Sequence, residues 1–344
     1  MGVTYDGATV AVVVPAYNES GLVGRVIETV PDYVDRVYVV EDGSTDDTWA
    51  EIRAAARRVN AEAARADGFD RRVVPIRHEV NRGVGGAIKT GYLAARDDDI
   101  DVTAVMGGDA QMRPELLAGV IDPVVAGEAD YVKGNRLLDA DHREGMPRFR
   151  YVGNRVLTWL TRIASGYWTI GDPQNGYTAI SQDALETAGI EEMYEYYGYC
   201  NDLLVRCNVA GLRVMDVPRP ANYGDEESHI DYRSYVPKVS VMLFRGFLRR
   251  LWRKHVRADP HPMAGLYAAS AGAGLYAARR AVRRRDDGGL GAALLALLTA
   301  GLCLVAALAL DRNHDAALGR RRETLQRPSP PESESPPATP VEQD

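Results

Sequence analysis

Residues 9–19 read Thr-Val-Ala-Val-Val-Val-Pro-Ala-Tyr-Asn-Glu. The valine run is apolar almost without a break, which is typical of a parallel strand covered on both faces. Further strands are predicted at 36–41, 72–77, 102–107 and 130–133, with helices near 20–30, 46–59, 84–97 and 113–127. This alternation predicts an α/β fold with a mostly parallel sheet and helices on both faces.

Two loops that follow the first two strands are the first candidate for a binding site. They read Pro15-Ala16-Tyr17-Asn18-Glu19 and Glu41-Asp42-Gly43-Ser44-Thr45-Asp46. Ligands of such sheets bind beyond the carboxyl ends of the strands, where these loops meet. Their carboxylates can accept hydrogen bonds from a nucleobase or a ribose. Each loop alone is equally well explained as a turn and a helix cap, but the two together indicate a site.

The charge of the chain is divided unevenly along its 344 residues. Residues 1–232 carry 23 Lys and Arg against 38 Asp and Glu, whereas residues 233–344 carry 18 against 10. A nucleic-acid-binding protein needs a basic surface, so we expect no nucleic-acid partner for the acidic part. The three cysteines form no CxxC pair and the six histidines are scattered, which argues against a zinc site.

The basic part adjoins segments that suit a membrane. On a helix, residues 241–256 place Leu, Phe and Trp on one side and Arg and Lys on the other. This is typical of a helix that lies on an anionic membrane, although an ordinary surface helix has a similar pattern. Gly288 to Leu310 is a run of 23 uncharged residues. At ~1.5 Å per residue it extends over roughly 34 Å, enough to cross a bilayer.

A second crossing is less clear from the residues. Met263 to Ala278 is uncharged over 16 residues but rich in Ala and Gly. If both segments cross, the five arginines between Arg279 and Arg285 lie outside the cell, against the tendency of basic loops to stay inside. A single crossing, with the shorter segment in the membrane interface, is the alternative.

Four more segments complete a recognisable set. They read Asn81-Arg82-Gly83-Val84-Gly85-Gly86-Ala87, Asp109-Ala110-Gln111-Met112-Arg113-Pro114-Glu115, Lys133-Gly134-Asn135-Arg136 and Asp172-Pro173-Gln174-Asn175-Gly176-Tyr177. With the first two loops, they resemble the family 2 glycosyltransferases, which have the GT-A (Rossmann-like) fold. The resemblance covers roughly residues 9–232. It is closest to the branch of dolichyl-phosphate mannose synthases and bacterial polyprenyl-phosphate glucosyltransferases.

The resemblance implies a donor site for a nucleotide diphospho-sugar, a UDP- or GDP-hexose. Its residues are Pro15, Tyr17, Glu19, Glu41, Asp42, Arg82, Gly83, Asp109 and Gln111. Asp109 and Gln111 are also implied to meet a Mg²⁺ or Mn²⁺ ion. The family usually has Asp-x-Asp here, but this chain reads Gly107-Gly108-Asp109, so one carboxylate is missing. One carboxylate, one amide, phosphate oxygens and water can still complete an octahedral site. The alternative is that Asp109 only starts the next helix.

The resemblance also implies residues for the acceptor and for catalysis. Arg136 matches the arginine of a Gly-Ser-Arg segment, and Arg148 and Arg150 lie where lipid-phosphate relatives hold the acceptor phosphate; the alternative for these two is a solvated helix start. Asp202 stands where many relatives have a carboxylate base, so it is expected to act as base or to orient the acceptor. Ser228-His229 corresponds loosely to a loop that closes over the pyrophosphate.

The implied function is that of an inverting hexosyltransferase which uses polyprenyl (dolichyl) phosphate, a membrane lipid, as acceptor for glycan assembly. Transfer to a hydroxyl of a lipid-linked glycan or glycolipid is one alternative. A non-catalytic, membrane-tethered sugar-nucleotide-binding protein is another. The Gln-x-x-Arg-Trp motif of processive relatives does not occur, which argues against polymer extension.

The expected organisation is a cytoplasmic catalytic domain at 1–232, an amphipathic interfacial region at 233–260 and a membrane segment at 261–311. Two spans, 262–280 and 288–310, are favoured because the glucosyltransferases that the chain resembles carry paired C-terminal helices. Residues 312–344 are expected to form a basic and then disordered tail, because Pro, Ser and Glu dominate it from Arg327 onward.

Overall fold

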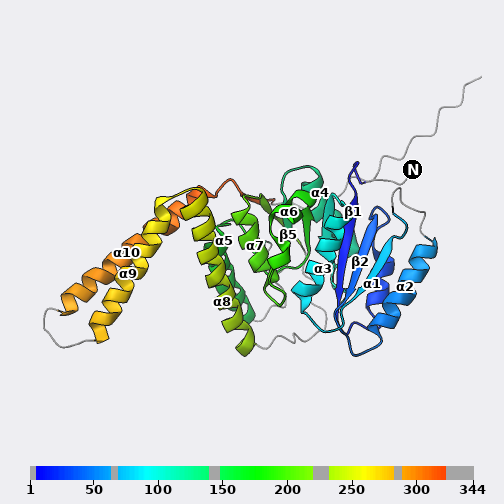
Figure 1. Ribbon diagram of the computed structural model, residues 1–344, viewed down its shortest axis with the longest axis horizontal. Helices are drawn as coiled ribbons and strands as arrows, with labels where there is room; N and C mark the ends of the chain where they lie inside the picture. The colour runs from blue at the N-terminus through cyan, green and yellow to red at the C-terminus, as the bar shows by residue number, and fades with distance from the viewer. Residues whose placement is uncertain (1–4, 63–68, 139–147, 220–231, 283–288, 323–344) are drawn as a thin grey trace, which may run out of the picture.

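The computed structural model describes residues 5–62, 69–138, 148–219, 232–282 and 289–322, and its centre is one eight-stranded sheet (Figure 1). The strand order is β3-β2-β1-β4-β6-β5-β7-β8. Neighbouring strands are parallel except at β6, which is antiparallel to both β4 and β5. The strands are β1 (Val10–Ala16), β2 (Arg36–Glu41), β3 (Val73–Arg77), β4 (Val102–Val105), β5 (Tyr131–Asn135), β6 (Thr178–Ser181), β7 (Val214–Pro218) and β8 (Gly319–Arg321).

Helices cover both faces of the sheet, as predicted. Alternate residues of β1 face opposite sides: Val12 belongs to a core with α1, α2 and α4, and Val13 to a core with α3, α6 and α7. The helices are α1 (Val23–Thr29), α2 (Thr48–Glu62), α3 (Val84–Asp97), α4 (Ala118–Val125), α5 (Arg148–Ser165), α6 (Gln182–Thr187) and α7 (Tyr199–Val209). The mostly parallel α/β sheet is therefore confirmed.

Some elements differ from the expectation. The helix expected at 113–127 is divided into a 3-10 turn at Pro114–Leu116 and α4. Strands β6, β7 and β8 were not predicted from the sequence. Because β6 is antiparallel to both of its neighbours, β5 and β7 run parallel to β4. The carboxyl ends of β5 and β7 therefore lie at the same sheet edge as those of β1 and β2.

The C-terminal part is helical and projects away from the sheet (Figure 1). Helix α8 (Tyr232–Trp252) continues into a π-helical turn at Arg253–Ala258, followed by α9 (Pro262–Val282) and α10 (Gly289–His314). Helices α9 and α10 pack side by side, and the Ser270 hydroxyl donates a hydrogen bond to the Ala300 carbonyl (2.9 Å). In the part of the chain that is described, one helix, Leu290–His314, is long and apolar enough to cross a membrane.

After α10 the chain returns to the catalytic sheet. Strand β8 pairs with β7 in parallel, with Asp216 opposite Arg321. Residues 312–314 belong to α10, so the first part of the expected tail is ordered structure; residues 323–344 lie outside the described part. Both ends of the α9–α10 hairpin are therefore attached to the same domain.

A buried ion pair joins the hairpin to the domain. The Arg250 side chain has no exposed surface and donates to both carboxylate oxygens of Asp311 (2.8 and 2.7 Å). The same guanidinium donates to the carbonyls of Ile163 and Ala164 in α5, and Asp311 also accepts from the Tyr267 hydroxyl (3.0 Å). One cluster thus connects α5, α8, α9 and α10.

Replacement of Asp311 by Ala should strongly destabilise the protein, because it leaves the Arg250 charge buried without its main partner. The expected cost is about 3 kcal/mol, a fall of roughly 6–12 °C in the melting temperature of the detergent-solubilised chain. Asp259→Ala is the control, because Asp259 is exposed at 3.8 Å from His314. The double variant Arg250→Met/Asp311→Leu should regain much of the loss. An unchanged melting temperature for Asp311→Ala would mean that the pair does not hold the hairpin.

Candidate active site

The loop after β1 and the loop after β2 are bound to each other. Asn18 has a left-handed backbone (φ 55°), and its side-chain oxygen accepts from the Thr45 amide (2.9 Å). In return, the Ser44 hydroxyl accepts from the Asn18 amide (3.0 Å). These contacts bring the predicted donor residues Pro15, Tyr17 and Glu19 beside the 41–46 loop, with the Tyr17 ring exposed.

The two acidic residues of the second loop are buried and shape it. Glu41 accepts from the Ser44 amide and from Arg77 Nε (3.0 Å). Asp42 accepts from the backbone amides of Arg82 (2.9 Å) and Gly83 (2.8 Å). Asp42 thereby fixes the loop that precedes α3 at the same edge. A direct contact of either carboxylate with a nucleoside remains a prediction.

His78 is a further partner of this loop, which the sequence analysis did not single out. Its Nδ1 lies 2.6 Å from Asp42 Oδ1 and its Nε2 lies 2.9 Å from the Thr90 hydroxyl.

The loop before α3 also contacts the segment at Glu195. Arg82 forms an ion pair with Glu195 (2.7 Å), and a Cβ on Gly83, which has φ 85°, would lie 2.7 Å from the Glu195 carbonyl oxygen. Only glycine therefore fits this close approach of the two loops.

Asp109 lies just beyond β4, in the segment expected to hold a metal. Its Oδ1 accepts from the Gln111 amide (3.0 Å), and Ala110 between them has a left-handed backbone (φ 57°). Non-glycine residues rarely adopt this conformation, and such strain is concentrated at functional sites. A Cβ on Gly107 would lie 3.0 Å from Asp109 Oδ1, so the position of the missing aspartate faces the carboxylate that remains.

The donor set at Asp109 fits a cation that takes most of its ligands from a substrate. Among the described residues, no three His, Cys, Asp or Glu side chains gather in a way that could hold a metal ion alone. Mg²⁺ is commonly bound by one or two carboxylates together with substrate phosphates and water. Asp109 and Gln111 are compatible with that arrangement.

Arg136 is held firmly at the carboxyl end of β5. Its Nε and Nη2 donate to the two oxygens of Asp172 (2.7 and 3.2 Å). Burial alone would raise the pKa of Asp172, but the charge and hydrogen bonds of Arg136 outweigh it, so the pKa lies below its ordinary value. The pair fixes the orientation of the guanidinium, which stays partly exposed.

Arg219 is a site residue that the sequence analysis missed. It directly follows β7, is buried, and stacks over the Tyr177 ring (4.7 Å) while Nη1 donates to the Asn175 side chain (3.1 Å). Its Nε has no hydrogen-bond partner, and no described carboxylate lies within 4.0 Å. Burial lowers its pKa, and the charges of Asp109 and Asp172 act in the opposite direction. A buried guanidinium beside these residues suits a phosphate.

Asp202 has its carboxylate occupied. Oδ2 accepts from Arg206 Nε (2.6 Å) and from the Tyr194 amide (3.1 Å), and Oδ1 accepts from Arg249 (2.8 Å). The residue therefore links α7 to α8, and its role as a base remains a prediction. The neighbouring Asn201 donates to the Thr161 hydroxyl (2.7 Å).

The remaining predicted site residues are less well defined. Arg148 and Arg150 lie in the first turn of α5, but their side chains lie outside the described part. Ser228 and His229 lie outside the described residues altogether.

Asp216 of β7 binds the segment that precedes Asp172. Its Oδ2 accepts from the Gly171 amide and from Asn135 Nδ2 (both 2.6 Å). Burial raises its pKa from 3.8 to about 6. The folded state therefore binds this proton more tightly than the unfolded state, and ionised Asp216 lowers stability above about pH 6.

Replacement of Asp216 by Asn should remove that pH dependence while keeping an acceptor oxygen. The variant should be more stable than the parent at pH 7.5, by about 3 kcal/mol at most. The advantage should shrink as the pH falls through 6 and vanish below the ordinary pKa of 3.8, because the parent is then protonated in both states. Melting temperatures of both proteins across this range test the prediction. A constant difference at all pH values would contradict it.

Comparison with known proteins identifies a family and relatives of this chain. Residues 11–189 match the family model described as glycosyl transferase family 2. A UDP-N-acetylglucosamine–dolichyl-phosphate N-acetylglucosaminyltransferase of Methanococcus voltae is 29% identical over 208 residues, which cover 60% of this chain and 82% of the relative. A polyprenol monophosphomannose synthase of Mycolicibacterium smegmatis is 31% identical over 214 residues, covering 60% of this chain and 75% of the relative.

Among solved structures, glucosyl-3-phosphoglycerate synthase of Mycobacterium tuberculosis, in complex with Mn²⁺, UDP and glucosyl-3-phosphoglycerate, is similar with a TM-score of 0.47 and 20% identity. The similarity covers 72% of this chain and 80% of that one. The family match extends over more than half of the sequence and includes the loops after β1, β2 and β4. The chain is a glycosyltransferase and belongs to glycosyl transferase family 2.

Proposed function

We propose that the enzyme transfers a hexose from a nucleotide diphospho-sugar to the phosphate of a membrane polyprenol. The observation that carries this proposal is the pair of guanidinium groups at the site: Arg136, held by Asp172, and Arg219, which has no described carboxylate partner. Both stand at the sheet edge beyond β5 and β7, where an acceptor phosphate and a donor diphosphate must meet. The names of the two relatives, which act on dolichyl phosphate and polyprenol, support the same acceptor class.

The acceptor chemistry explains why a strong base is not needed. A phosphate monoester has a second pKa of about 6, so it is mostly a dianion near neutral pH and already nucleophilic. One of its oxygens forms a bond to the anomeric carbon, and the bond from that carbon to the diphosphate oxygen breaks on the opposite face, which inverts the configuration. Asp202, with its oxygens occupied by two arginines, then serves to position α7 against α8.

Charge on the departing diphosphate has to be offset. A divalent cation held by Asp109 and Gln111 would supply part of the positive charge. Arg219 supplies a fixed charge from a buried position, where electrostatic stabilisation is stronger than in water. Arg136 orients the acceptor phosphate through the part of its guanidinium that Asp172 leaves exposed.

The helices after the catalytic domain suit the delivery of a lipid acceptor. On α8, Phe244 (61% exposed), Leu248 and Trp252 (63% exposed) form an outward apolar face. The adjacent α5 exposes Val156 and Trp159. These faces favour the interpretation of α8 as an interfacial helix, now starting at Tyr232 rather than near 241.

We infer a topology with two crossings. Strand β8 follows α10 and pairs with β7, so the end of α10 must lie on the same side of the membrane as the catalytic domain. If α10 crosses, α9 must cross as well, because an odd number of crossings would separate β8 from its sheet. The 21 residues of α9 extend over roughly 31 Å, enough for this. The catalytic domain then faces the cytoplasm and the arginines after Ala278 face outward.

The proposed reaction predicts a sharp acceptor preference. Purified full-length enzyme, given a panel of labelled UDP- and GDP-hexoses and a divalent metal, should transfer label to polyprenyl phosphate and not to the free polyprenol. EDTA should inhibit, and Mg²⁺ or Mn²⁺ should restore activity. Asp109→Asn should lose at least ~100-fold of the rate without loss of fold. Equal transfer to the alcohol would favour a hydroxyl acceptor, and an active Asp109→Asn enzyme would remove Asp109 from the site.

Replacement of Arg219 by Met should separate catalysis from stability. The loss of one buried charge that faces phosphate is expected to reduce kcat/KM by roughly 100-fold. The melting temperature should not fall by more than a few degrees, because the variant also removes a buried guanidinium without a described carboxylate partner. A large fall in stability with unchanged turnover of the remaining folded enzyme would assign Arg219 a structural role.

The two-crossing topology can be tested with single cysteines. In a background with Cys303 replaced by Ser, one cysteine is placed at Val282, which is 84% exposed at the end of α9, and in another protein at Arg320 in β8. An impermeant thiol reagent on intact cells should label position 282 and not position 320. Label at 320 alone would indicate a single crossing, and label at neither would place the hairpin on the inner membrane surface.

A further inference from the structure

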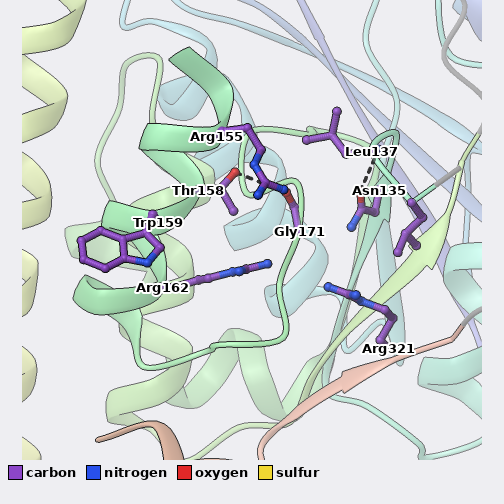
Figure 2. A pocket seen from close by; sticks show the side chains of 9 residues that line it. Asn135, Leu137, Arg155, Thr158, Trp159, Arg162, Gly171 and Arg321 are labelled. Carbon is purple, nitrogen blue, oxygen red and sulfur yellow. Dashed lines mark hydrogen bonds between the residues drawn. The ribbon is translucent and has the colours of Figure 1, made fainter. Parts of the chain in front are cut away.

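A polar pocket lies between α5 and β8, beside the segments that carry Arg136 and Asp172 (Figure 2). Helix α5 forms one wall, β8 forms the opposite one, and the end of β5 and the loop before Asp172 close it. Its volume is about 220 Å³. Its lining includes Arg155, Trp159 and Arg162 of α5 and Arg321 of β8.

Three arginines from two distant parts of the sequence converge on this pocket. Arg155 and Arg162 are seven residues apart on α5, which puts them on the same helix face. Arg321 comes from β8, and Figure 2 shows the guanidinium groups of Arg162 and Arg321 directed toward each other across the opening. Arg162 Nε donates to the Ile170 carbonyl (2.7 Å), and Arg321 donates to the Thr169 carbonyl (2.5 Å).

These positive charges have little direct compensation from the described part of the protein around them. Within the described residues, no carboxylate lies within 4.0 Å of any of the three guanidinium groups. The buried carboxylate of Asp216 acts on Arg162 without a direct ion pair, and its Oδ2 accepts from Gly171 and Asn135. Burial lowers the pKa of Arg162, and repulsion from Arg321 and Arg155 lowers it further. Such a cluster gains stability when an anion enters it.

The size of the pocket restricts the anion. At ~30 Å³ per water molecule, the volume corresponds to roughly seven waters. This is enough for a phosphate group with a few waters, and it is smaller than the ~300 Å³ at which pockets for larger organic ligands begin. Arginine forks bind phosphate oxygens in pairs, which makes phosphate the best match to the three side chains.

We propose that the Arg155–Arg162–Arg321 pocket binds a phosphate group, carried by an anionic membrane lipid, at a position that the proposed acceptor residue Arg136 does not line. The membrane source is favoured by Trp159, which lines the pocket and is 52% exposed, and by the exposed Val156 and Leu160 on the same helix. Tryptophan is enriched at the level of lipid headgroups. A bound phosphate would bridge α5 to β8 and so hold the return strand in place.

Binding measurements on the full-length protein without donor or acceptor test this proposal independently of the transferase reaction. The probes are vesicles of phosphatidylcholine with and without phosphatidylglycerol, and inorganic phosphate alone. Phosphatidylglycerol should raise the melting temperature of the parent protein. The double variant Arg155→Gln/Arg321→Gln should bind phosphatidylglycerol at least about tenfold more weakly. The matched control, Arg257→Gln/Arg320→Gln, removes two exposed arginines outside the pocket lining and should keep the parent's affinity.

The outcomes separate the sources of the phosphate. A shift with phosphatidylglycerol that only the pocket variant loses supports the lipid site. A matching shift with inorganic phosphate, lost in the same variant, supports the pocket as a phosphate site and overturns the lipid assignment. No shift with either probe, or equal loss in both double variants, overturns the proposal, because general attraction to a charged surface would then account for binding.

Discussion

The buried contact between Arg250 and Asp311 is the constraint on which the arrangement of the domain and the α9–α10 hairpin depends. Burial of two charges is expensive, and an ion pair in such a place adds little net stability compared with apolar residues. Its effect is on specificity: the guanidinium has partners only when α5, α8 and α10 meet in one way. Removal of any one of these helices would leave a charge or a carbonyl group without a partner. The end of the α9–α10 hairpin is thus held against α5 and α8, where the hairpin begins.

The pairing of β8 with β7 also connects the hairpin to the residues proposed to bind phosphate. Strand β8 extends the catalytic sheet beyond β7, and β7 leads directly into Arg219. Helix α5, which carries the carbonyls bound by Arg250, begins at the expected acceptor arginine Arg148. The α9–α10 hairpin and the residues proposed to bind phosphate are therefore fixed on the same elements. An acceptor phosphate at the membrane surface can be held by the protein without movement of a separate domain, which lowers the entropic cost of bringing the reactants together.

Much of the fold could be predicted from local sequence, and the reason is physical. The valine strand at 9–14 is apolar on both faces because helices cover both faces, and the loops after β1 and β2 turn at Asn18 and Gly43, which have positive φ. Arg136 could be found because it directly follows a strand in a recognisable segment. Arg148 marks the start of α5 for the same reason of local pattern.

The rest depends on contacts between distant residues. Strand β8 is three residues long and polar, so nothing local distinguishes it from a tail, and only pairing with β7 orders it. Arg219 becomes a site residue because Tyr177 and Asn175 hold it in a buried position, and a lone arginine after a strand gives no such signal. The position of Asp202 in the sequence predicts a catalytic base, but its carboxylate oxygens accept hydrogen bonds from two arginines that follow it in the chain. Tertiary contact decides the role in each case.

A disulfide between β7 and β8 tests the central claim most directly, that the hairpin returns to the catalytic sheet of the active enzyme. Met215 and Arg320 are paired in the parallel register, so their Cα atoms are expected ~4.8 Å apart, within the range of a disulfide. Oxidised Met215→Cys/Arg320→Cys protein, with Cys303 replaced by Ser, should form the bond in native membranes, as seen by peptide mass spectrometry. It should keep transferring hexose to polyprenyl phosphate at close to the rate of the reduced form. Failure of the bond to form, or loss of activity that reduction restores, would contradict this account.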